Sequence, residues 1–232
     1  MKQFETEHYI FHYGADSSAE RDIADIAAYQ ESCHSHICKV LKVNPDFKIR
    51  YFLCETPEEV GRIYGDNEPC NGFTVAPDTI YAVYNQKTKC IGFHEDAHII
   101  SYSIYRPDCP AIRDGLAMFF DRKWWGLHNL DWTGYYLENG RSISIAALLD
   151  ITAFFAEDCS FTYPVMGAFT EWLISSFGID RYMEMYQHDD IPGAMEAIYG
   201  QTPSELNSGF LEYVRLFDPD PAVKKRIQEL LQ

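Results

Sequence analysis

The chain has 232 residues, of which 47% are hydrophobic and 15% aromatic. This composition supports a core in one large domain or two small ones, and it excludes a fully disordered chain. The 19 basic residues are outnumbered by 35 acidic ones, and the formal net charge of −16 disfavours nucleic-acid binding because phosphate would be repelled. No apolar run approaches the roughly 20 residues that span a bilayer, so we expect no membrane span.

The first residues and the cysteines bear on the cellular compartment. The start, Met1 to Glu5, shows no apolar segment of the kind that signal peptides carry, so we expect a cytoplasmic protein, or a secreted one if a signal peptide has been removed. The seven cysteines are odd in number and include no CxxC pair, which disfavours a disulfide framework and a cysteine-based zinc ribbon. We therefore expect buried free thiols in a reducing compartment.

The first part of the chain alternates strand and helix signals. Residues 9–13 predict a strand, and the possible N-caps around Ser17 predict a helix that runs to about Lys42. A second strand is predicted at 48–54, followed by a helix that starts with Thr56 as its cap and Pro57 in its first turn. A third strand, β-branched and aromatic, is predicted at 79–84.

After about residue 89 the signals become helical, and Trp124 to Arg141, rich in glycine and aromatic residues, is predicted to be an irregular connection. The predicted helices are 91–105, 110–124, 143–156, 164–177, 179–187, 191–199, 203–216 and 221–231. We therefore predict an α+β protein with a small N-terminal α/β half, a mixed sheet and an all-helical C-terminal half. We place the subdomains at 1–125 and 126–232.

The motif with the clearest chemistry is His94-Glu95-Asp96-Ala97-His98, an HExxH sequence. On a helix its two histidines lie about 6 Å apart in rise and on one face, so that both imidazoles can reach one cation. Glu95 lies one position round the helix, where it can deprotonate a water molecule beside the metal. The alternative is a surface helix with two solvated histidines.

A catalytic zinc site needs a third protein ligand. The helix with the motif is predicted to end near Tyr105, a rise of roughly 10 Å beyond His98. Asp108 as N-cap and Pro110 near the first helical position then start the next helix. That helix returns roughly 6 Å by Asp114, which we expect near the level of His98 in an antiparallel helix pair.

Three segments resemble a known family. Arg113 to Asp121 resembles the EGLA-x-x-F segment that follows HExxH in gluzincin metallopeptidases, the peptidase-MA-like group. Tyr163 to Leu173, followed by a Phe-Gly pair, is similar to a Y-x-x-x-G-x-F-x-x-(W/Y)-L helix of these enzymes, and residues 201–213 are similar to their closing helices. The likeness covers about residues 79 to 215 and implies a zincin-like fold. The chain departs from the family at Asp114, where the family has glutamate.

The resemblance implies a zinc-dependent peptidase whose partner is a peptide or protein substrate. It implies that His94, His98 and Asp114 bind Zn²⁺ and that Glu95 is the general base. It also implies that the strand at 79–84 is the edge strand on which an extended substrate lies. The two subdomains would then form one catalytic unit with the cleft between them. Ligation by Asp114 needs its helix close to the helix with the HExxH motif. Gly115, which has no side chain, would allow this close approach.

Several weaker candidates stay open at this stage. Gluzincins often add a Tyr or His that stabilises the oxyanion. We choose Tyr163 for this role, although Tyr135, Tyr136 or His128 could serve instead. The alternative role for Tyr163 is a packed aromatic side chain. Cys90 lies four residues before His94. If the helix with the motif begins at or before Cys90, the thiol lies on the same face as the two histidines; otherwise it is a structural thiol. Asp121 could orient a ligand, although a solvated carboxylate is the more common role.

The other histidines are predicted to be solvated or locally paired, because His34 and His36 point in different directions on a helix and His8 and His12 lie on or near a strand.

Two competing functions remain beside the peptidase. One is a catalytically degenerate relative that binds a peptide or protein without cleaving it, which the change at Asp114 keeps open. The other is a small-molecule metallohydrolase. The sequence does not predict an oligomeric state.

Overall fold

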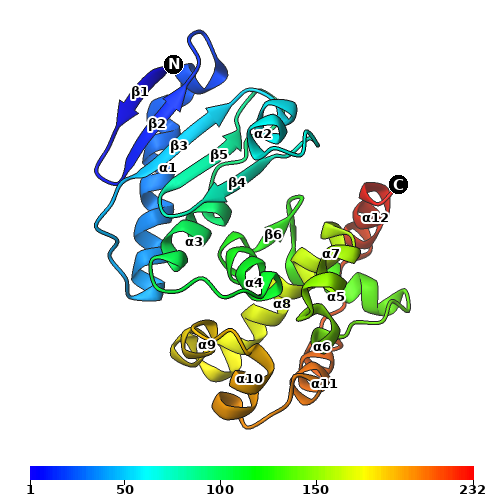
Figure 1. Ribbon diagram of the computed structural model, residues 1–232. Coiled ribbons are helices and arrows are strands. Elements are labelled where there is room, and N and C mark those ends of the chain that lie inside the picture. Colours follow the sequence, from blue (N-terminus) through cyan, green and yellow to red (C-terminus); the bar gives the residue numbers. More distant parts are fainter. The chain divides into compact units, whose positions relative to one another are not determined.

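The computed structural model describes the whole chain, Met1–Gln232, and its architecture is α+β (Figure 1). One mixed five-stranded sheet and twelve helices account for most of it, which confirms the predicted fold class. The chain divides into two compact units, Met1–Ile104 and Tyr105–Gln232. No helix is both long enough and apolar enough to cross a membrane.

The sheet of the first unit has the strand order β1-β2-β3-β5-β4. The strands are β1 (Lys2–Glu5), β2 (Tyr9–Tyr13), β3 (Ile49–Cys54), β4 (Gly72–Val75) and β5 (Thr79–Val83). The three strands predicted from the sequence, β2, β3 and β5, are parallel to one another, whereas β1 and β4 run antiparallel at the two edges.

The expectation that the strand at 79–84 is an edge strand is wrong. β5 pairs with β3 on one side and with β4 on the other, so its backbone has no open side. The edge next to it is β4, which the sequence did not reveal because its four residues, Gly72–Val75, are too few for a clear alternation of buried and exposed side chains.

Three helices pack on this sheet. They are α1 (Ser18–Leu41), α2 (Pro57–Tyr64) and α3 (Phe93–Tyr102). The side chain of Ser17 accepts a hydrogen bond from the Glu20 amide at the start of α1, and Thr56 caps α2 in the same way. Both helix starts therefore agree with the sequence prediction.

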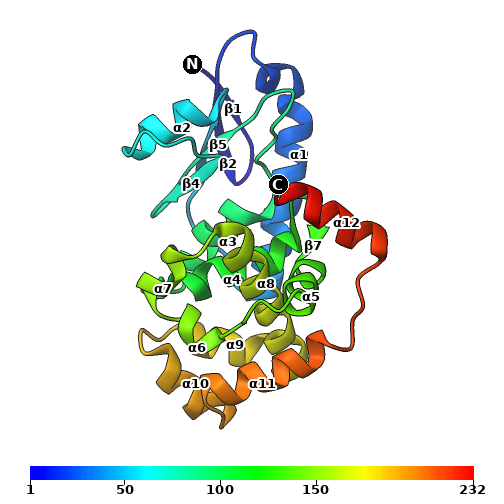
Figure 2. The ribbon, with the colours of Figure 1, turned by 90° about the vertical axis from the view of Figure 1, so that its right-hand side faces the viewer.

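The helices α1 and α2 cover opposite faces of the sheet (Figure 2). On one face, the Tyr9 hydroxyl donates a hydrogen bond to the Gln30 carbonyl of α1. On the other face, Val60 of α2 packs into a buried cluster with Cys54 and Val83. Packing on both faces buries the central strands, as the near-continuous apolar sequence of β3 and β5 requires.

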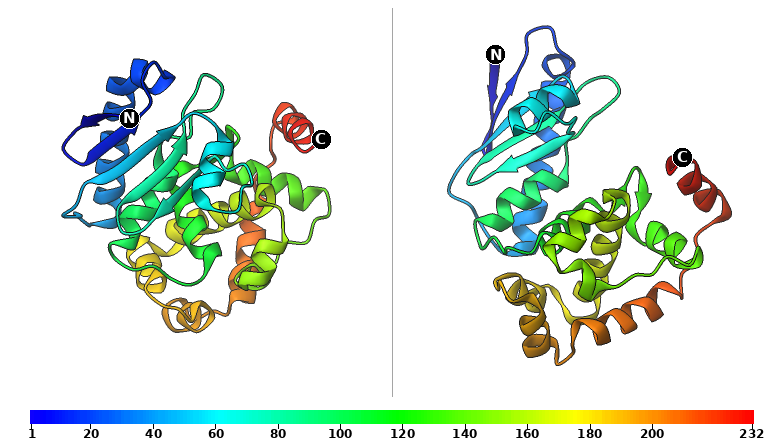
Figure 3. Two further views of the ribbon diagram at one scale, coloured as in Figure 1. Left: turned by 45° about the horizontal axis from the view of Figure 1, so that its top comes forward. Right: turned by 45° about the vertical axis from the view of Figure 1, so that its right-hand side comes forward.

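The second unit is helical around α8 (Cys159–Phe177), which packs against α4, α5 and α9. Its other elements are α4 (Pro110–Asp121), β6 (Lys123–Trp124), β7 (Leu127–His128), α5 (Asn129–Glu138), α6 (Ile145–Leu148), α7 (Ile151–Ala156), α9 (Ile179–Tyr186), α10 (Ile191–Tyr199), α11 (Pro203–Val214) and α12 (Pro221–Leu230). Figure 3 shows α12 at the end of the extended segment that follows α11.

The close approach at Gly115 is made to α8. A Cβ on Gly115 would lie 2.6 Å from the Thr170 hydroxyl and 3.2 Å from the Met166 carbonyl, so only glycine fits there. Glycine is therefore required at this position by the packing of α4 on α8, and not by the expected approach to the helix that carries the HExxH motif.

The predicted irregular connection between Trp124 and Arg141 is wrong, because it contains the β6–β7 hairpin and the helix α5. Helix α8 also starts earlier than predicted, with Pro164 inside it. Pro164 cannot donate to the Ser160 carbonyl four residues back, and the Tyr136 hydroxyl donates to that carbonyl instead, at 2.8 Å.

Candidate metal centre

The two motif histidines lie on consecutive turns of α3. Gly92 precedes the helix with a φ of 128°, a conformation that favours glycine, and α3 then places His94 and Glu95 in its first turn. The His94 and His98 rings stand edge to face, with centroids 5.0 Å apart. His98 is buried and His94 is half-buried. The local helix therefore brings both imidazoles together, as the spacing predicts.

His98 has a neighbour on its own helix that can fix its tautomer. The Tyr102 hydroxyl lies 3.3 Å from His98 Nδ1. If Nδ1 carries the proton and donates it to this hydroxyl, the ring lone pair is on Nε2, which is the form that binds a metal. Such an orienting partner is typical of metal-binding histidines.

Glu95 is held against the edge strand β4. The Thr74 hydroxyl donates a hydrogen bond to Glu95 Oε2 at 2.6 Å. A Cβ on Gly72 would lie 3.1 Å from Glu95 Oε1, so the absent side chain leaves room for the carboxylate beside the strand. The sequence did not predict these contacts, because they depend on a strand that it did not reveal.

Asp96, inside the motif, anchors α3 to the rest of the unit. It is fully buried and accepts hydrogen bonds from the Tyr9 hydroxyl at 2.5 Å and the Gln30 amide at 3.0 Å. Burial raises the pKa of the Asp96 carboxyl well above its usual range, although these hydrogen bonds oppose the rise. Sequence reasoning missed this residue. The signal was a carboxylate on the same helical face as the apolar Ile99 and Ile100.

Asp114, the expected third ligand, lies on α4 in the second unit. Cys109 is the N-cap of this helix and Pro110 its first residue, so the expected N-cap at Asp108 is wrong by one position. Asp121 is the last residue of the same helix.

Tyr163 lies near the start of α8 among other aromatic rings. Its ring meets Trp124 edge to face at 5.3 Å and stacks on Phe154 at 6.2 Å. Two of the alternatives have structural partners. The Tyr136 hydroxyl donates to the Ser160 carbonyl of α8, and His128 caps α5 by accepting a hydrogen bond from the Leu130 amide.

Cys90 lies outside the motif helix. Because α3 begins at Phe93, Cys90 does not share the helical face of His94, and the condition for its metal contact is not met. Its backbone amide donates to the Val83 carbonyl, in the segment that leads from the sheet to α3.

A second histidine pair forms away from the motif. The His8 and His34 rings stack at 4.0 Å, and His8 Nδ1 lies 2.6 Å from Glu31 Oε2. Of the two expected states, solvated or locally paired, His34 is in the second: it is only 2% exposed and lies 3.7 Å from Cys38, four residues further along α1. Burial, with the nearby charge of His8 as a smaller cause, lowers the pKa of His34 to about 4.

Comparisons with known proteins add no family assignment: no family model, no curated protein and no solved structure matches this chain. The functional interpretation therefore depends on the residues themselves and on their surroundings.

Proposed function

We propose that the protein is a zinc-dependent metallopeptidase. The observation that carries this proposal is the arrangement on α3, where two histidine rings lie edge to face with centroids 5.0 Å apart and the intervening Glu95 is held by Thr74. Two imidazoles on one helical face with a fixed carboxylate beside them are the parts that an HExxH hydrolase requires.

His94, His98 and Asp114 are the proposed zinc ligands. In support, each offers an atom that can bind a metal: an imidazole nitrogen from each histidine and a carboxylate oxygen from the aspartate. Two nitrogen donors and one carboxylate suit zinc and leave a position for water or substrate. When bound, zinc would polarise the scissile carbonyl and make water a stronger nucleophile.

Glu95 is the proposed general base. Thr74 donates to Oε2, which leaves Oε1 as the oxygen that accepts a proton from the attacking water. The same carboxyl group then passes that proton to the amine of the leaving product. Tyr163 is the proposed donor to the oxygen that becomes negatively charged, through its phenol hydroxyl.

An extended peptide would pair with β4 rather than with β5. β4 is at the edge of the sheet and has a strand partner on one side only. Its Thr74 donates a hydrogen bond to Glu95, so a substrate along this strand would pass close to the proposed general base. Backbone pairing on a sheet edge binds a peptide with little dependence on its sequence.

A degenerate relative that binds a peptide or protein without cleaving it is the second candidate. It is favoured by Asp114, whose side chain is one methylene shorter than the glutamate of the family that the sequence resembles. A shorter ligand could hold zinc too weakly for turnover while the strand edge still binds peptide.

Digestion of a peptide library separates these two functions. The protein loaded with zinc is expected to cleave library peptides, and treatment with a chelator is expected to abolish cleavage, which returns when zinc is added. Stoichiometric zinc without any cleavage would favour the degenerate relative. Cleavage that survives the chelator would contradict the metal mechanism.

A further inference from the structure

The parallel strands of the first unit end together at one edge of the sheet. β2 is paired in parallel with β3, and β3 with β5, so the carboxyl ends of all three point the same way. Gly14 follows β2, Glu55 follows β3, and Asn85 follows β5 after one intervening residue. Residues that are far apart in the sequence therefore meet at this edge, in a place that the proposed peptidase chemistry does not use.

The helices that leave this edge diverge. Ser17 caps α1, which packs on the face of the sheet that carries Tyr9, and Thr56 caps α2, which packs on the opposite face with Cys54. In open α/β sheets, neighbouring strands whose helices go to opposite faces leave a crevice beyond their carboxyl ends, and ligands bind in that crevice.

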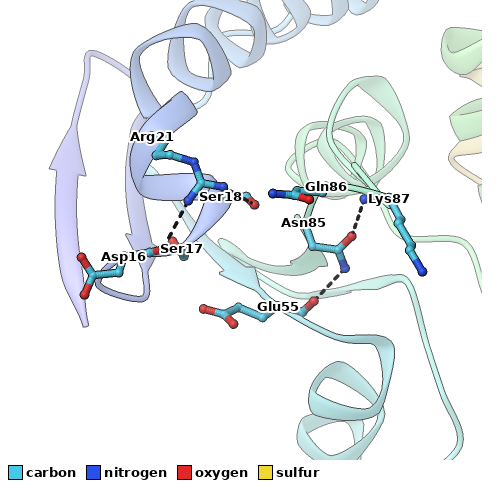
Figure 4. A pocket seen from close by; sticks show the side chains of 8 residues that line it. All are labelled: Asp16, Ser17, Ser18, Arg21, Glu55, Asn85, Gln86 and Lys87. Atoms are coloured by element: carbon cyan, nitrogen blue, oxygen red, sulfur yellow. Dashed lines mark hydrogen bonds between the residues drawn. The ribbon is translucent and has the colours of Figure 1, made fainter.

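A pocket of about 420 Å³ lies there (Figure 4). This volume is in the range of small-molecule sites. Its lining consists of residues from the three strand ends and the first turn of α1: Asp16, Ser17, Ser18, Arg21, Glu55, Asn85, Gln86 and Lys87.

Hydrogen bonds within the lining fix its shape. The Asn85 amide donates to the Glu55 carbonyl at 2.7 Å, and its oxygen accepts from the Lys87 backbone amide at 2.8 Å. Arg21 donates to the Ser18 hydroxyl at 2.9 Å. A Cβ on Gly14 would lie 3.1 Å from Glu55 Oε1, so the absent side chain leaves room for this carboxylate.

The charges of the lining are balanced. Two cations, Arg21 and Lys87, stand with two anions, Asp16 and Glu55, in one pocket. A ligand with a charge of one sign would meet like charges as well as opposite ones, whereas a zwitterion can oppose each with its own. The side-chain amide of Gln86 adds a neutral donor and a neutral acceptor.

We propose that this pocket binds a small zwitterion, an α-amino acid or a dipeptide, with its carboxylate toward Arg21 and its ammonium toward Glu55. None of the lining residues belongs to the proposed zinc site, so the pocket is a second binding site, and it stands even if the chain is not a peptidase.

Calorimetric titration of the full chain tests the proposal. L-alanine and alanyl-alanine are the probes, and which of the two binds more tightly distinguishes amino acid from dipeptide. N-acetylalanine and alanine amide, which each lack one charge, should bind roughly tenfold more weakly or worse. Inorganic phosphate or glucose that binds while both zwitterions fail would overturn the proposal, and so would the absence of binding by any probe.

Variants assign the binding to the pocket. Arg21→Gln and Glu55→Gln each remove one charge from an exposed side chain. Each should weaken the binding of the tighter-binding zwitterion roughly tenfold or more. Glu58→Gln, an exposed carboxylate on α2 outside the lining, is the matched control and should bind as the unaltered chain does. Unchanged binding in both pocket variants would overturn the proposal.

A titration followed by NMR needs no variant and therefore does not depend on the folding of one. Shifts of amide signals should be confined to residues 14–21, 55 and 85–88. Shifts centred elsewhere would place the ligand at another site and overturn the proposal.

Discussion

Two pairs of histidines lie ring to ring in the first unit, and they differ in origin and surroundings. His94 and His98 are neighbours on one helix, with ring centroids 5.0 Å apart. His8 and His34 come from positions 26 residues apart and stack at 4.0 Å. Closeness of two imidazoles is therefore not enough to identify a metal site.

The groups around each pair explain the difference. The motif pair has the fixed carboxylate of Glu95 in the same helical turn, beside a strand edge. The stacked pair has His34 buried against Tyr9, with Cys38 at 3.7 Å, and His8 bound to Glu31. The proposed metal role of the first pair depends on the carboxylate beside it, whereas the second pair joins a buried imidazole to a half-buried one that is bound to Glu31.

Replacement of the proposed general base should have the largest effect on activity. Glu95→Gln is expected to lower kcat about 10³-fold with little change in zinc content, because the amide keeps the position but cannot accept a proton. His34→Gln is the control and should keep kcat. Steady-state kinetics and metal analysis check this; turnover retained in Glu95→Gln would show that another group is the base.

Removal of the proposed third ligand should lower the affinity for zinc. Asp114→Ala is expected to weaken zinc binding more than about 100-fold, since loss of an outer partner of a ligand alone costs 10–100-fold. Asp114→Glu need not restore affinity, because the longer side chain would crowd a site built for aspartate. Zinc affinities from competition with a chelator decide this, and unchanged affinity in Asp114→Ala would exclude Asp114 as a ligand.

The proposed oxyanion donor predicts a smaller loss. Tyr163→Phe should fold, bind zinc and lose roughly 10²-fold in kcat, the effect of one transition-state hydrogen bond. Tyr136→Phe is the matched control, because its hydroxyl serves the Ser160 carbonyl and its loss should lower stability without lowering kcat. An unchanged kcat in Tyr163→Phe would show that Tyr163 contributes to packing and not to the reaction.

The stacked pair should affect the pH dependence of stability and leave the chemistry unchanged. His34 has a pKa of about 4 in the fold, lowered by burial from 6.5, so the unfolded chain takes up a proton first as the pH falls. Stability should therefore decrease from about pH 6.5 to about pH 4, and His34→Gln should flatten this decrease. Melting temperatures across this range check it; identical profiles for both proteins would contradict it.

The two pairs also show which features the sequence predicts. The motif pair follows from helical spacing alone, and the capped starts of α1 and α2 follow from local signals at Ser17 and Thr56. The stacked pair depends on β2 lying against α1, which no local pattern encodes.

The errors have the same cause. The resemblance places the edge strand at 79–84, and the true edge strand, β4, is too short to give a pattern that corrects it. The strands of the hairpin at Trp124 have two residues each, so they give no pattern either. The anchoring role of Asp96 depends on Tyr9 and Gln30, which are distant in the sequence.

Metal analysis tests the central claim that the motif pair holds zinc and the stacked pair does not. The unaltered chain, supplied with zinc and then dialysed, should retain about one zinc per chain. His98→Ala should lose it, and His8→Ala should keep it. A chain that retains no zinc, or a His98→Ala variant that still binds one equivalent, would contradict the account.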